Sequence, residues 1–152
     1  LMKVKPHLEG EEMFLANYAD GLSDLPLEPY IEEFRRSNAV AAFVAVRPSL
    51  SLSGVSFESD GTVTGITYLN DSNVWINGGF FVLRPEIFEF MRPGEELVEE
   101  PFRRLIEARR LKAYRYEGFW SAMDTFKDKK NFDDMIERGY TPWRVWDSGG
   151  RG

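Results

Sequence analysis

Two aspartates occupy positions at which an α/β protein binds its ligands. Asp20 follows residues 12–18, a short apolar run bounded by turn residues that predicts a buried strand. Open α/β sheets bind ligands beyond the carboxyl ends of their strands. Asp124 lies one residue before Thr125, the predicted N-cap of the last helix. If the strands before the two aspartates are neighbours, both carboxylates face one crevice. From position alone, the simpler interpretation is local: Asp20 shapes a loop and Asp124 favours a helix N-terminus.

A converging pair of carboxylates would select a hard cation. Mg²⁺ is held by one or two carboxylates and completed by water and substrate phosphates. Zinc is disfavoured because the chain has no cysteine and its single histidine, His7, lies in a polar lead-in. Asp24 could assist a metal, although Ser23 and Asp24 fit the N-cap of the following helix better. The chain has none of the signatures of serine hydrolases, P-loop proteins or the dinucleotide-binding fingerprint.

Two adjacent glycines interrupt an apolar strand pattern. Residues 74–83 (VWINGGFFVL) predict one strand, and Gly78 and Gly79 in its middle indicate either a bulge or the close approach of a ligand or another backbone. Asn77 beside them needs a hydrogen-bond partner if it is buried. Nearby aromatic residues could stack on a sugar, although aromatic strands more often belong to a core; these residues are Trp75, Phe80, Phe81 and Trp120.

Composition predicts a single globular domain. The 152 residues carry a net charge of −6, and 43% of them are hydrophobic, which is enough apolar side chain for a core. The acidic balance argues against nucleic-acid binding, and Arg103, Arg104, Arg109 and Arg110 fit the solvated face of one helix. The absence of cysteine excludes disulfides and thiolate sites. No segment has the length and apolarity to cross a bilayer and no signal pattern is present, so a cytoplasmic protein without membrane partners is expected.

The remaining patterns predict the α/β sheet that must position these residues. A helix after Pro26 has apolar residues at 27, 30, 31 and 34, and residues 39–46 form a continuously apolar strand typical of parallel sheets. With strand 12–18 they make a βαβ unit. Further predicted elements are a hairpin of residues 52–58 and 62–68 that turns at Asp60-Gly61, a turn at 70–73, helices 85–91 and 100–110, a half-buried strand 111–116, and a helix capped by Thr125 and ended by Gly139. Helix 100–110 would bury Phe102, Leu105 and Ile106. Residues 1–11 are a lead-in, 12–147 one domain and 148–152 a frayed tail.

Three stretches follow one another along the chain, residues 14–24 (FLANYADGLSD), 75–83 (WINGGFFVL) and 117–125 (EGFW and MDT), and a tail follows at 142–146 (PWRVW). In this order they resemble the sugar-1-phosphate nucleotidylyltransferases, and among them the glucose-1-phosphate cytidylyltransferase type. The resemblance implies a Rossmann-like, three-layer α/β fold with an inserted β-hairpin. It also implies Mg²⁺-dependent transfer of a nucleotidyl group from an NTP, CTP above all, to a sugar-1-phosphate, glucose-1-phosphate above all, with release of pyrophosphate.

The resemblance also assigns residues. Asp20 and Asp124 match the family's two metal-binding aspartates, which reverses the local interpretation of their positions and makes them the catalytic pair. The stretch that lines the family's sugar-phosphate pocket is matched by Asn77, Gly78 and Gly79, and a segment beside it by Glu117 and Trp120.

Two features of the family are missing. Its glycine-rich phosphate loop with an arginine and a lysine would precede Leu1, and a lysine that contacts the sugar phosphate has no counterpart in residues 66–71 (ITYLND). Loss of a cation from a phosphate contact costs about 1.5–3 kcal/mol. The chain is therefore expected to be an N-terminally incomplete C-terminal part, inactive alone, with an open sheet edge and a possible homo-oligomer. The alternative is a non-catalytic sugar-phosphate-binding or regulatory domain derived from this family.

Overall fold

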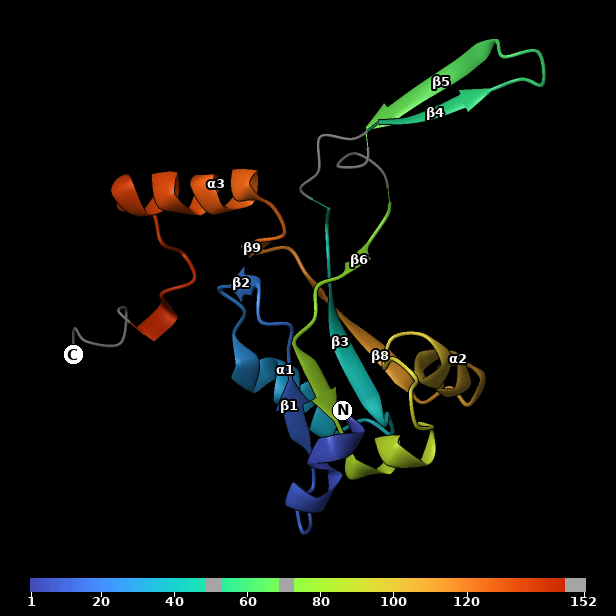
Figure 1. Cartoon of the computed structure of the whole chain (residues 1–152), viewed down its shortest axis with the longest axis vertical. Helices are drawn as coiled ribbons and strands as arrows, with labels where there is room; N and C mark the ends of the chain where they lie inside the picture. The colour runs from blue at the N-terminus through green and yellow to red at the C-terminus, as the bar shows by residue number, and fades with distance from the viewer. Residues whose placement is uncertain (49–52, 69–72, 147–152) are drawn as a thin grey trace.

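A computed structural model describes residues 1–48, 53–68 and 73–146, with a five-stranded mixed sheet at the centre (Figure 1). In the middle lies β3 (Ala41–Val46). One edge of β3 pairs in parallel with β8 (Leu111–Tyr116). The two ends of its other edge pair antiparallel with β6 (Ile76–Asn77) and β7 (Phe81–Leu83). Since β7 also pairs antiparallel with β1 (Phe14–Ala16), β1 and β3 run in the same direction with β7 between them.

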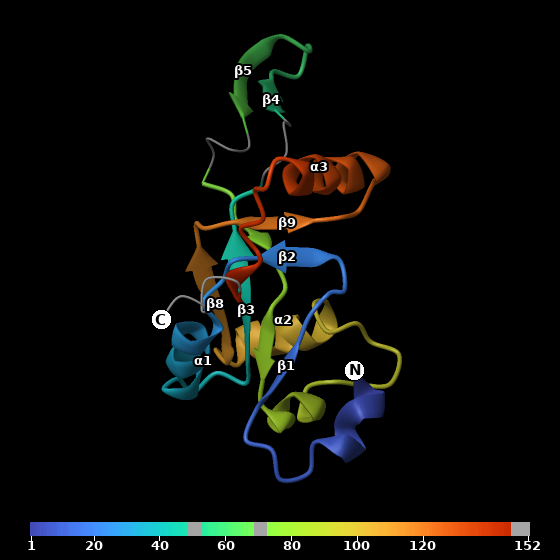
Figure 2. The same cartoon turned by 90° about the vertical axis from the view of Figure 1, so that its left-hand side faces the viewer.

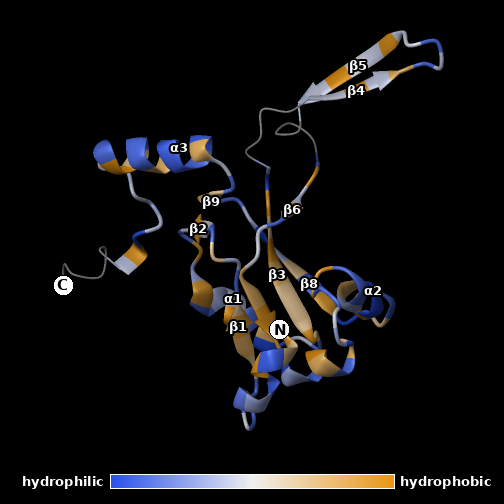
Figure 3. Cartoon of the chain, in the orientation of Figure 1, coloured by the Kyte–Doolittle hydropathy of each residue, from blue (hydrophilic) through white to orange (hydrophobic). Residues whose placement is uncertain are grey.

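Helices cover both faces of the sheet, which makes three layers. One face is covered by α1 (Leu27–Arg35), and its core contains Leu25, Tyr30, Phe34, Ala39, Ala42, Val44, Val46 and Val82. The other face is covered by η1 (Met2–His7), η3 (Pro85–Glu89) and α2 (Glu100–Glu107), and its core contains Val40, Ala41, Phe81, Leu83, Ile87, Phe88, Met91, Phe102 and Leu105. Successive β3 side chains enter opposite cores, so the strand is buried on both faces, as its unbroken apolar sequence predicts. Figure 3 shows this hydrophobic centre beside the hydrophilic surface of α3 (Phe126–Glu137).

The first strand is shorter and more exposed than its sequence predicts. β1 contains three residues, and Leu15 is 51% exposed because β1 lies at an edge of the described sheet. The segment after it is not simply a loop, since β2 (Gly21–Ser23) pairs antiparallel with β9 (Trp120–Ala122) in a separate two-stranded ribbon (Figure 2). A strand is present where the sequence predicts one, but its predicted burial and the predicted loop after it are wrong, because pairing with distant segments decided both.

Residues 74–83 form two strands and not the single strand predicted. The break lies at Gly78–Phe80, where Gly79 has φ +76° and Phe80 has φ +50°. A strand cannot continue through this left-handed backbone region. Both halves still pair with β3, but antiparallel to it. In the described sheet, the strand that pairs with β3 in parallel is β8.

The last helix agrees closely with the sequence. At its start, the backbone N–H of Asp128 donates to Thr125 Oγ1 at 3.2 Å and the N–H of Thr125 donates to Asp128 Oδ2 at 2.9 Å, which completes the predicted capping box. Past its end, Gly139 has φ +70°. The other helices lie near their predicted positions, with η1 inside the lead-in and residues 85–89 forming a 3₁₀ helix. Among the described residues, no helix combines the length and apolarity needed to cross a membrane.

Two details of the predicted helices are wrong. α2 ends at Glu107, and its buried side chains are Pro101, Phe102 and Leu105, whereas Ile106 is 62% exposed. The N-cap of α1 is Pro26, and Ser23 and Asp24 do not cap it.

Ser23 and Asp24 bind the turn between β8 and β9. The Ser23 hydroxyl donates to the Phe119 carbonyl at 2.7 Å, and the Tyr116 hydroxyl donates to the Asp24 carboxylate at 2.5 Å. Burial and this carboxylate raise the pKa of Tyr116. The two contacts fasten β2 and the residue after it to the end of β8 and to the β8–β9 turn.

The predicted hairpin is present as β4 (Ser53–Phe57) and β5 (Val63–Tyr68), and it projects away from the sheet (Figures 1 and 2). In its turn, Gly61 has φ +90° and the backbone N–H of Thr62 donates to Asp60 Oδ1 at 2.9 Å. The predicted hairpin residue 52, turn residues 70–72 and the tail 148–152 lie outside the described residues.

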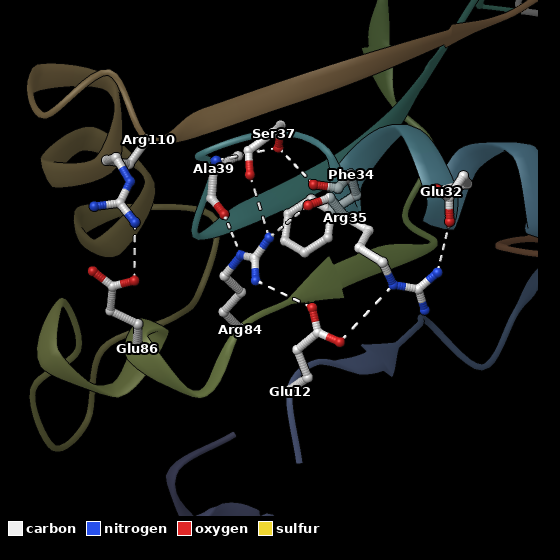
Figure 4. Close-up of polar contacts among 9 residues, drawn as sticks. All are labelled: Glu12, Glu32, Phe34, Arg35, Ser37, Ala39, Arg84, Glu86 and Arg110. Atoms are coloured by element: carbon white, nitrogen blue, oxygen red, sulfur yellow. Dashed lines mark hydrogen bonds and ion pairs between the residues drawn. The ribbon is translucent and has the colours of Figure 1, made fainter.

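Arginines fasten the elements at the amino end of β3. The Arg84 guanidinium donates to the carbonyls of Arg35, Ser37 and Ala39, and lies 3.7 Å from the Glu12 carboxylate (Figure 4). Arg110 pairs with Glu86 at 2.9 Å.

The arginine cluster is not the solvated helix face that the sequence predicts. Arg109 and Arg110 lie beyond the end of α2. Arg104 forms two hydrogen bonds with the Glu95 carboxylate, at 2.5 and 2.7 Å, and a third with the Phe90 carbonyl. Two of the four arginines therefore have structural partners.

We expect Glu95→Gln to destabilise the fold in a pH-dependent manner. Hydrogen bonds from Arg104 lower the pKa of Glu95 to about 2, from an ordinary value of 4.5. The ion pair therefore stabilises the folded state above pH 4.5, and this contribution is lost as the pH falls towards 2. Urea unfolding at several pH values measures the effect, with Glu96→Gln as the exposed control. Equal stabilities of the two variants at pH 7 would contradict the assignment.

Candidate active site

The two aspartates meet because β2 and β9 cross the same end of the sheet. β2 follows β1 and β9 follows β8, and the two short strands pair with Gly21 opposite Ala122. The ladder continues one step further, where the backbone N–H of Met123 donates to the Asp20 carbonyl at 3.0 Å. Asp20 and Asp124 therefore flank the same end of the ribbon formed by β2 and β9.

The carboxyl groups of the two aspartates are close enough to affect each other's protonation. Burial raises the pKa of Asp124, and the neighbouring Asp20 raises it further. Like charges held this close favour a bound proton or a bound cation between them. The arrangement can therefore hold a positive ion.

A pocket of about 270 Å³ opens at this pair. Its described lining is formed by Tyr18, Asp20, Gly21, Asn77, Gly78, Trp120, Ala122 and Asp124. Four separate segments contribute to it: the end of β1, the β2–β9 ribbon, the end of β6 and the chain leading into α3. None of these lining residues is a lysine or an arginine.

The glycines allow the strand break to lie against the pocket wall. A Cβ atom on Gly79 would lie 2.5 Å from Asn17 Oδ1, and one on Gly78 would lie 3.1 Å from both Trp120 Nε1 and the Val44 carbonyl. Hydrogen bonds hold the same backbone: Asn17 Oδ1 accepts from the N–H of Phe80 at 2.7 Å, and Trp120 Nε1 donates to the Gly78 carbonyl at 2.8 Å. The sequence left two explanations for the glycines, a bulge or the close approach of another group. The contacts favour close approach, and the approaching groups belong to the protein itself.

The Asn77 side chain is exposed, and hydrogen bonds to its neighbours hold it in place. Its Oδ1 accepts from the N–H of Gly79 at 2.9 Å, and its Nδ2 donates to the Tyr18 hydroxyl at 3.3 Å. The Tyr18 ring meets Phe81 edge-on, with 5.3 Å between ring centroids. Neither Asn17 nor Tyr18 is among the predicted site residues, although their positions, three and two residues before Asp20, are a signal that could have found them.

Comparison with known proteins gives sequence relatives over nearly the whole chain. No family model matches. A Bacillus subtilis protein named probable glucose-1-phosphate cytidylyltransferase is 33% identical over 148 residues, which is 96% of this chain and 58% of that protein. The chain is thus similar in sequence to proteins named glucose-1-phosphate cytidylyltransferase. The cytidylyltransferases of Salmonella typhi and Salmonella typhimurium are each 28% identical over 97% of the chain. The chain spans 58% of the length of all three relatives.

Solved structures confirm the predicted fold. A Bacillus anthracis protein assigned as a glucose-1-phosphate thymidylyltransferase, solved with sucrose, aligns over 88% of this chain and 57% of its own, with a TM-score of 0.61 and 11% identity. HddC from Yersinia pseudotuberculosis aligns over 88% of this chain and 60% of its own, with a TM-score of 0.56 and 14% identity. These likenesses support the Rossmann-like, three-layer nucleotidyltransferase fold that the sequence predicts.

Not every residue matched to the cytidylyltransferase pattern lines the pocket. Asp20, Asn77, Gly78, Trp120 and Asp124 do. Gly79 is buried behind the wall, where its φ and the Asn17 side chain explain it. Glu117 is exposed in the turn between β8 and β9 and is not part of the described lining.

Other candidates from the sequence serve the fold. Asp24 accepts the hydrogen bond from Tyr116, and Phe81 is buried in the core. Trp75 contacts arginine, with the Arg47 guanidinium carbon 4.3 Å from its ring centroid.

The two carboxylates at this pocket could hold a magnesium ion. Within the described residues, no group of three or more His, Cys, Asp or Glu side chains could hold a metal. Two carboxylates at an open pocket suit Mg²⁺, which takes few protein ligands and keeps water or phosphate oxygens on its other positions. They do not make the closed, nitrogen- or sulfur-rich cage of a structural zinc site.

Proposed function

We propose that this chain provides the metal-binding and sugar-phosphate-binding part of an enzyme that transfers a nucleotidyl group from CTP to glucose-1-phosphate. The observation that carries the proposal is the convergence of Asp20 and Asp124 at a pocket walled by Asn77 and Gly78. Sequence relatives named glucose-1-phosphate cytidylyltransferase support the choice of substrates.

The proposed reaction joins two anions. An oxygen of the sugar phosphate forms a bond to the α-phosphorus of the nucleotide, and the bond from that phosphorus to pyrophosphate breaks. Two such anions repel each other, so the protein's task is to hold them in line and to neutralise charge. Asp20 and Asp124 would hold Mg²⁺, which supplies that neutralisation when bound. Asn77 and the backbone at Gly78 would orient the sugar phosphate.

The nucleotide's phosphates need further groups. The family's glycine-rich phosphate loop does not occur in these 152 residues, and the relatives are longer than this chain. We therefore propose that turnover requires a segment beyond the residues present here. The alternative is a domain that binds a sugar phosphate without catalysis, which the missing loop and missing lysine favour.

Arg115 can replace the family lysine that this chain lacks. Ala45 on β3 pairs with Asn77 on β6 and with Arg115 on β8, so the three residues lie side by side across the sheet. Residues abreast on neighbouring strands project from the same face, and two strand spacings put Arg115 and Asn77 ~10 Å apart at Cα. The Arg115 guanidinium carbon lies 6.0 Å from the Trp75 ring centroid, beside Arg47. We propose that Arg115 binds the phosphate of the sugar.

Two measurements test the proposed function. Titration calorimetry of this chain with glucose-1-phosphate and Mg²⁺ should show binding, and the full reading frame that encodes it should release pyrophosphate from CTP and glucose-1-phosphate. Other NTPs and sugar phosphates, assayed in parallel, define the specificity. Binding without turnover in the full reading frame would support the non-catalytic alternative, and absence of binding would overturn both.

Arg115→Gln should weaken glucose-1-phosphate binding by about 10-fold or more. The estimate follows from a charge-assisted hydrogen bond of about 1.5–3 kcal/mol. Calorimetric titration of the variant measures the change, and Arg103→Gln on the exposed surface of α2 is the matched control. An unchanged dissociation constant for Arg115→Gln would exclude the arginine as the replacement for lysine while leaving the aspartate site intact.

A further inference from the structure

Helix α3 carries one buried side chain. Figure 1 shows the helix set apart from the helices that cover the sheet, and residues 123–125 join it to β9. The buried side chain is Phe132, whereas Phe126 and Ile136 are 93% and 56% exposed. Helices in proteins gain most of their stability from the face that packs against other elements. The placement of α3 therefore depends on what packs against Phe132.

Trp143 packs against Phe132 and also against the turn between β8 and β9. Its ring meets the Phe132 ring edge-on, with 5.3 Å between the centroids and 88° between the planes. The ring of Phe119, in the β8–β9 turn, lies with its centroid 5.5 Å from that of Trp143. Both distances lie in the range that aromatic pairs prefer. Trp143, which follows α3 in the chain, thus ties the helix back to this turn.

The turn that Trp143 contacts also supports the strand after Asp20. The Phe119 carbonyl accepts hydrogen bonds from the Ser23 hydroxyl at 2.7 Å and from the backbone N–H of Asp24 at 3.2 Å. Ser23 ends β2, and β2 begins directly after Asp20. One member of the aspartate pair is therefore attached, through β2, to the turn on which Trp143 packs.

The start of α3 supports the other member of the pair. Asp124 directly precedes Thr125, the N-cap, whose capping box with Asp128 fixes the first turn of the helix. The pairing of β2 with β9 continues only to the hydrogen bond between the Met123 N–H and the Asp20 carbonyl. Asp124 thus lies between the ribbon and the helix. Since no flexible residue separates it from the capping box, a rotation of α3 would move Asp124 relative to Asp20.

We propose that Trp143 is a positioning residue for the aspartate pair. By holding α3 against the β8–β9 turn, it fixes Asp124 with respect to Asp20, although neither Trp143 nor its two aromatic partners belongs to the described pocket lining. The inference rests on the metal site of the proposed function. It adds to that site a residue that acts through α3 and not by contact with the ligand.

The affinity of the 152-residue chain for Mn²⁺, which takes the same oxygen ligands as Mg²⁺, tests the proposal. Trp143→Ala should weaken Mn²⁺ binding about 10-fold, the lower end of the range for groups that orient metal ligands. Trp143→Phe keeps a ring beside Phe119 and Phe132 and should retain most of the affinity. Trp146→Ala is the matched control, because this tryptophan of the same tail is 67% exposed, and it should leave the affinity unchanged.

Two further measurements separate positioning from a general loss of stability. Leu105→Ala removes a fully buried side chain from the core under α2, so it should lower the free energy of unfolding without weakening Mn²⁺ binding by the folded chain. Residual dipolar couplings of backbone amides, measured by NMR without metal, report the direction of α3. One alignment should describe α3 and the sheet in the unmodified chain, and the couplings of α3 should shrink in Trp143→Ala.

The outcomes are distinct. Failure of the unmodified chain to bind Mn²⁺ would overturn the metal assignment of the proposed function, and this inference with it. If the unmodified chain binds Mn²⁺ and Trp143→Ala binds it equally well, the inference alone is overturned. Equal weakening in Trp143→Ala and Leu105→Ala would overturn it too, as would a loss of affinity while the couplings of α3 stay unchanged. Weaker binding together with smaller α3 couplings, in Trp143→Ala and not in Trp146→Ala, would establish the positioning role.

Discussion

Asp20→Asn and Asp124→Asn are each expected to remove divalent-cation binding from the pocket while leaving the fold at least as stable as before. The two side chains are the carboxylates of the described pocket lining. An amide in place of either removes a charge from a site that has only two. Since changes around metal ligands cost 10–100-fold in affinity, loss of a ligand itself should cost at least about 10-fold.

The stability part of this expectation follows from the direction of the Asp124 pKa. Burial raises the pKa of Asp124 above its ordinary value of 3.8, and the neighbouring Asp20 raises it further. Its carboxylate therefore opposes folding at neutral pH, and folding gains stability as the pH falls through the raised pKa. Asp124→Asn removes this cost, so its melting temperature at pH 7 should be no lower than that of the unmodified chain. Because a proton on Asp124 competes with the cation, cation binding should begin to weaken, as the pH falls, at a pH above the ordinary pKa of aspartate.

Manganese provides the measurement. Mn²⁺ replaces Mg²⁺ at oxygen sites and broadens nearby amide signals in NMR spectra, so Gly21, Gly78 and Ala122 should broaden in the unmodified chain and not in either variant. Asp24→Asn is the control, because its carboxylate is engaged by Tyr116 nearby. Unchanged Mn²⁺ affinity in both Asp20→Asn and Asp124→Asn would exclude these aspartates as metal ligands. A loss of Mn²⁺ affinity in Asp24→Asn would instead assign the metal to Asp24.

Gly79→Ala should lower the free energy of unfolding more than an alanine substitution at any glycine whose surroundings are open. Gly79 and Gly94 both have positive φ, +76° and +88°, but nothing lies within 4 Å of a Cβ at Gly94, whereas Asn17 Oδ1 lies 2.5 Å from one at Gly79. Gly94→Ala therefore measures the left-handed backbone alone, about 1–2 kcal/mol. The difference between the two variants measures the contact with Asn17, and we expect ~2 kcal/mol or more for this overpacking.

Urea unfolding measures both variants. Gly79→Ala should also weaken glucose-1-phosphate binding, because moving Asn17 breaks its hydrogen bond to Phe80 and shifts the pocket wall. If Gly79→Ala does not fold, Gly78→Ala with contacts of 3.1 Å provides a milder substitution at the same wall. Equal costs for Gly79→Ala and Gly94→Ala would show that the Asn17 contact relaxes freely.

Local patterns predicted the elements whose signals lie within a few residues. The α3 capping box, the Asp60-Gly61 turn and the apolar strand at β3 all agree with the structure, because hydrogen bonds within a turn or continuous burial produced the pattern. The prediction of a single strand over residues 74–83 is wrong for the opposite reason. Its break depends on Asn17 and Trp120, which contact the two glycines from remote positions.

The candidate site shows the same division. The types and positions of Asp20 and Asp124, together with the family resemblance, singled them out in the sequence, and the structure places both at one pocket. Tyr18 was missed because its role depends on contacts with Asn77 and Phe81 on other strands. The exposure of Glu117 could not be foreseen either, since a turn residue can face the pocket or solvent with the same local sequence.

Local patterns in the sequence predict most of the helices and the longer strands and single out the acidic pair, because periodicity, caps and motif residues are local properties. The tertiary structure decides which of these residues meet. β2 and β9 each have three residues and cannot be recognised alone. Their pairing places Asp20 beside Asp124. Such pairing depends on the whole sheet bringing two chain segments together, and no short window of sequence contains that information.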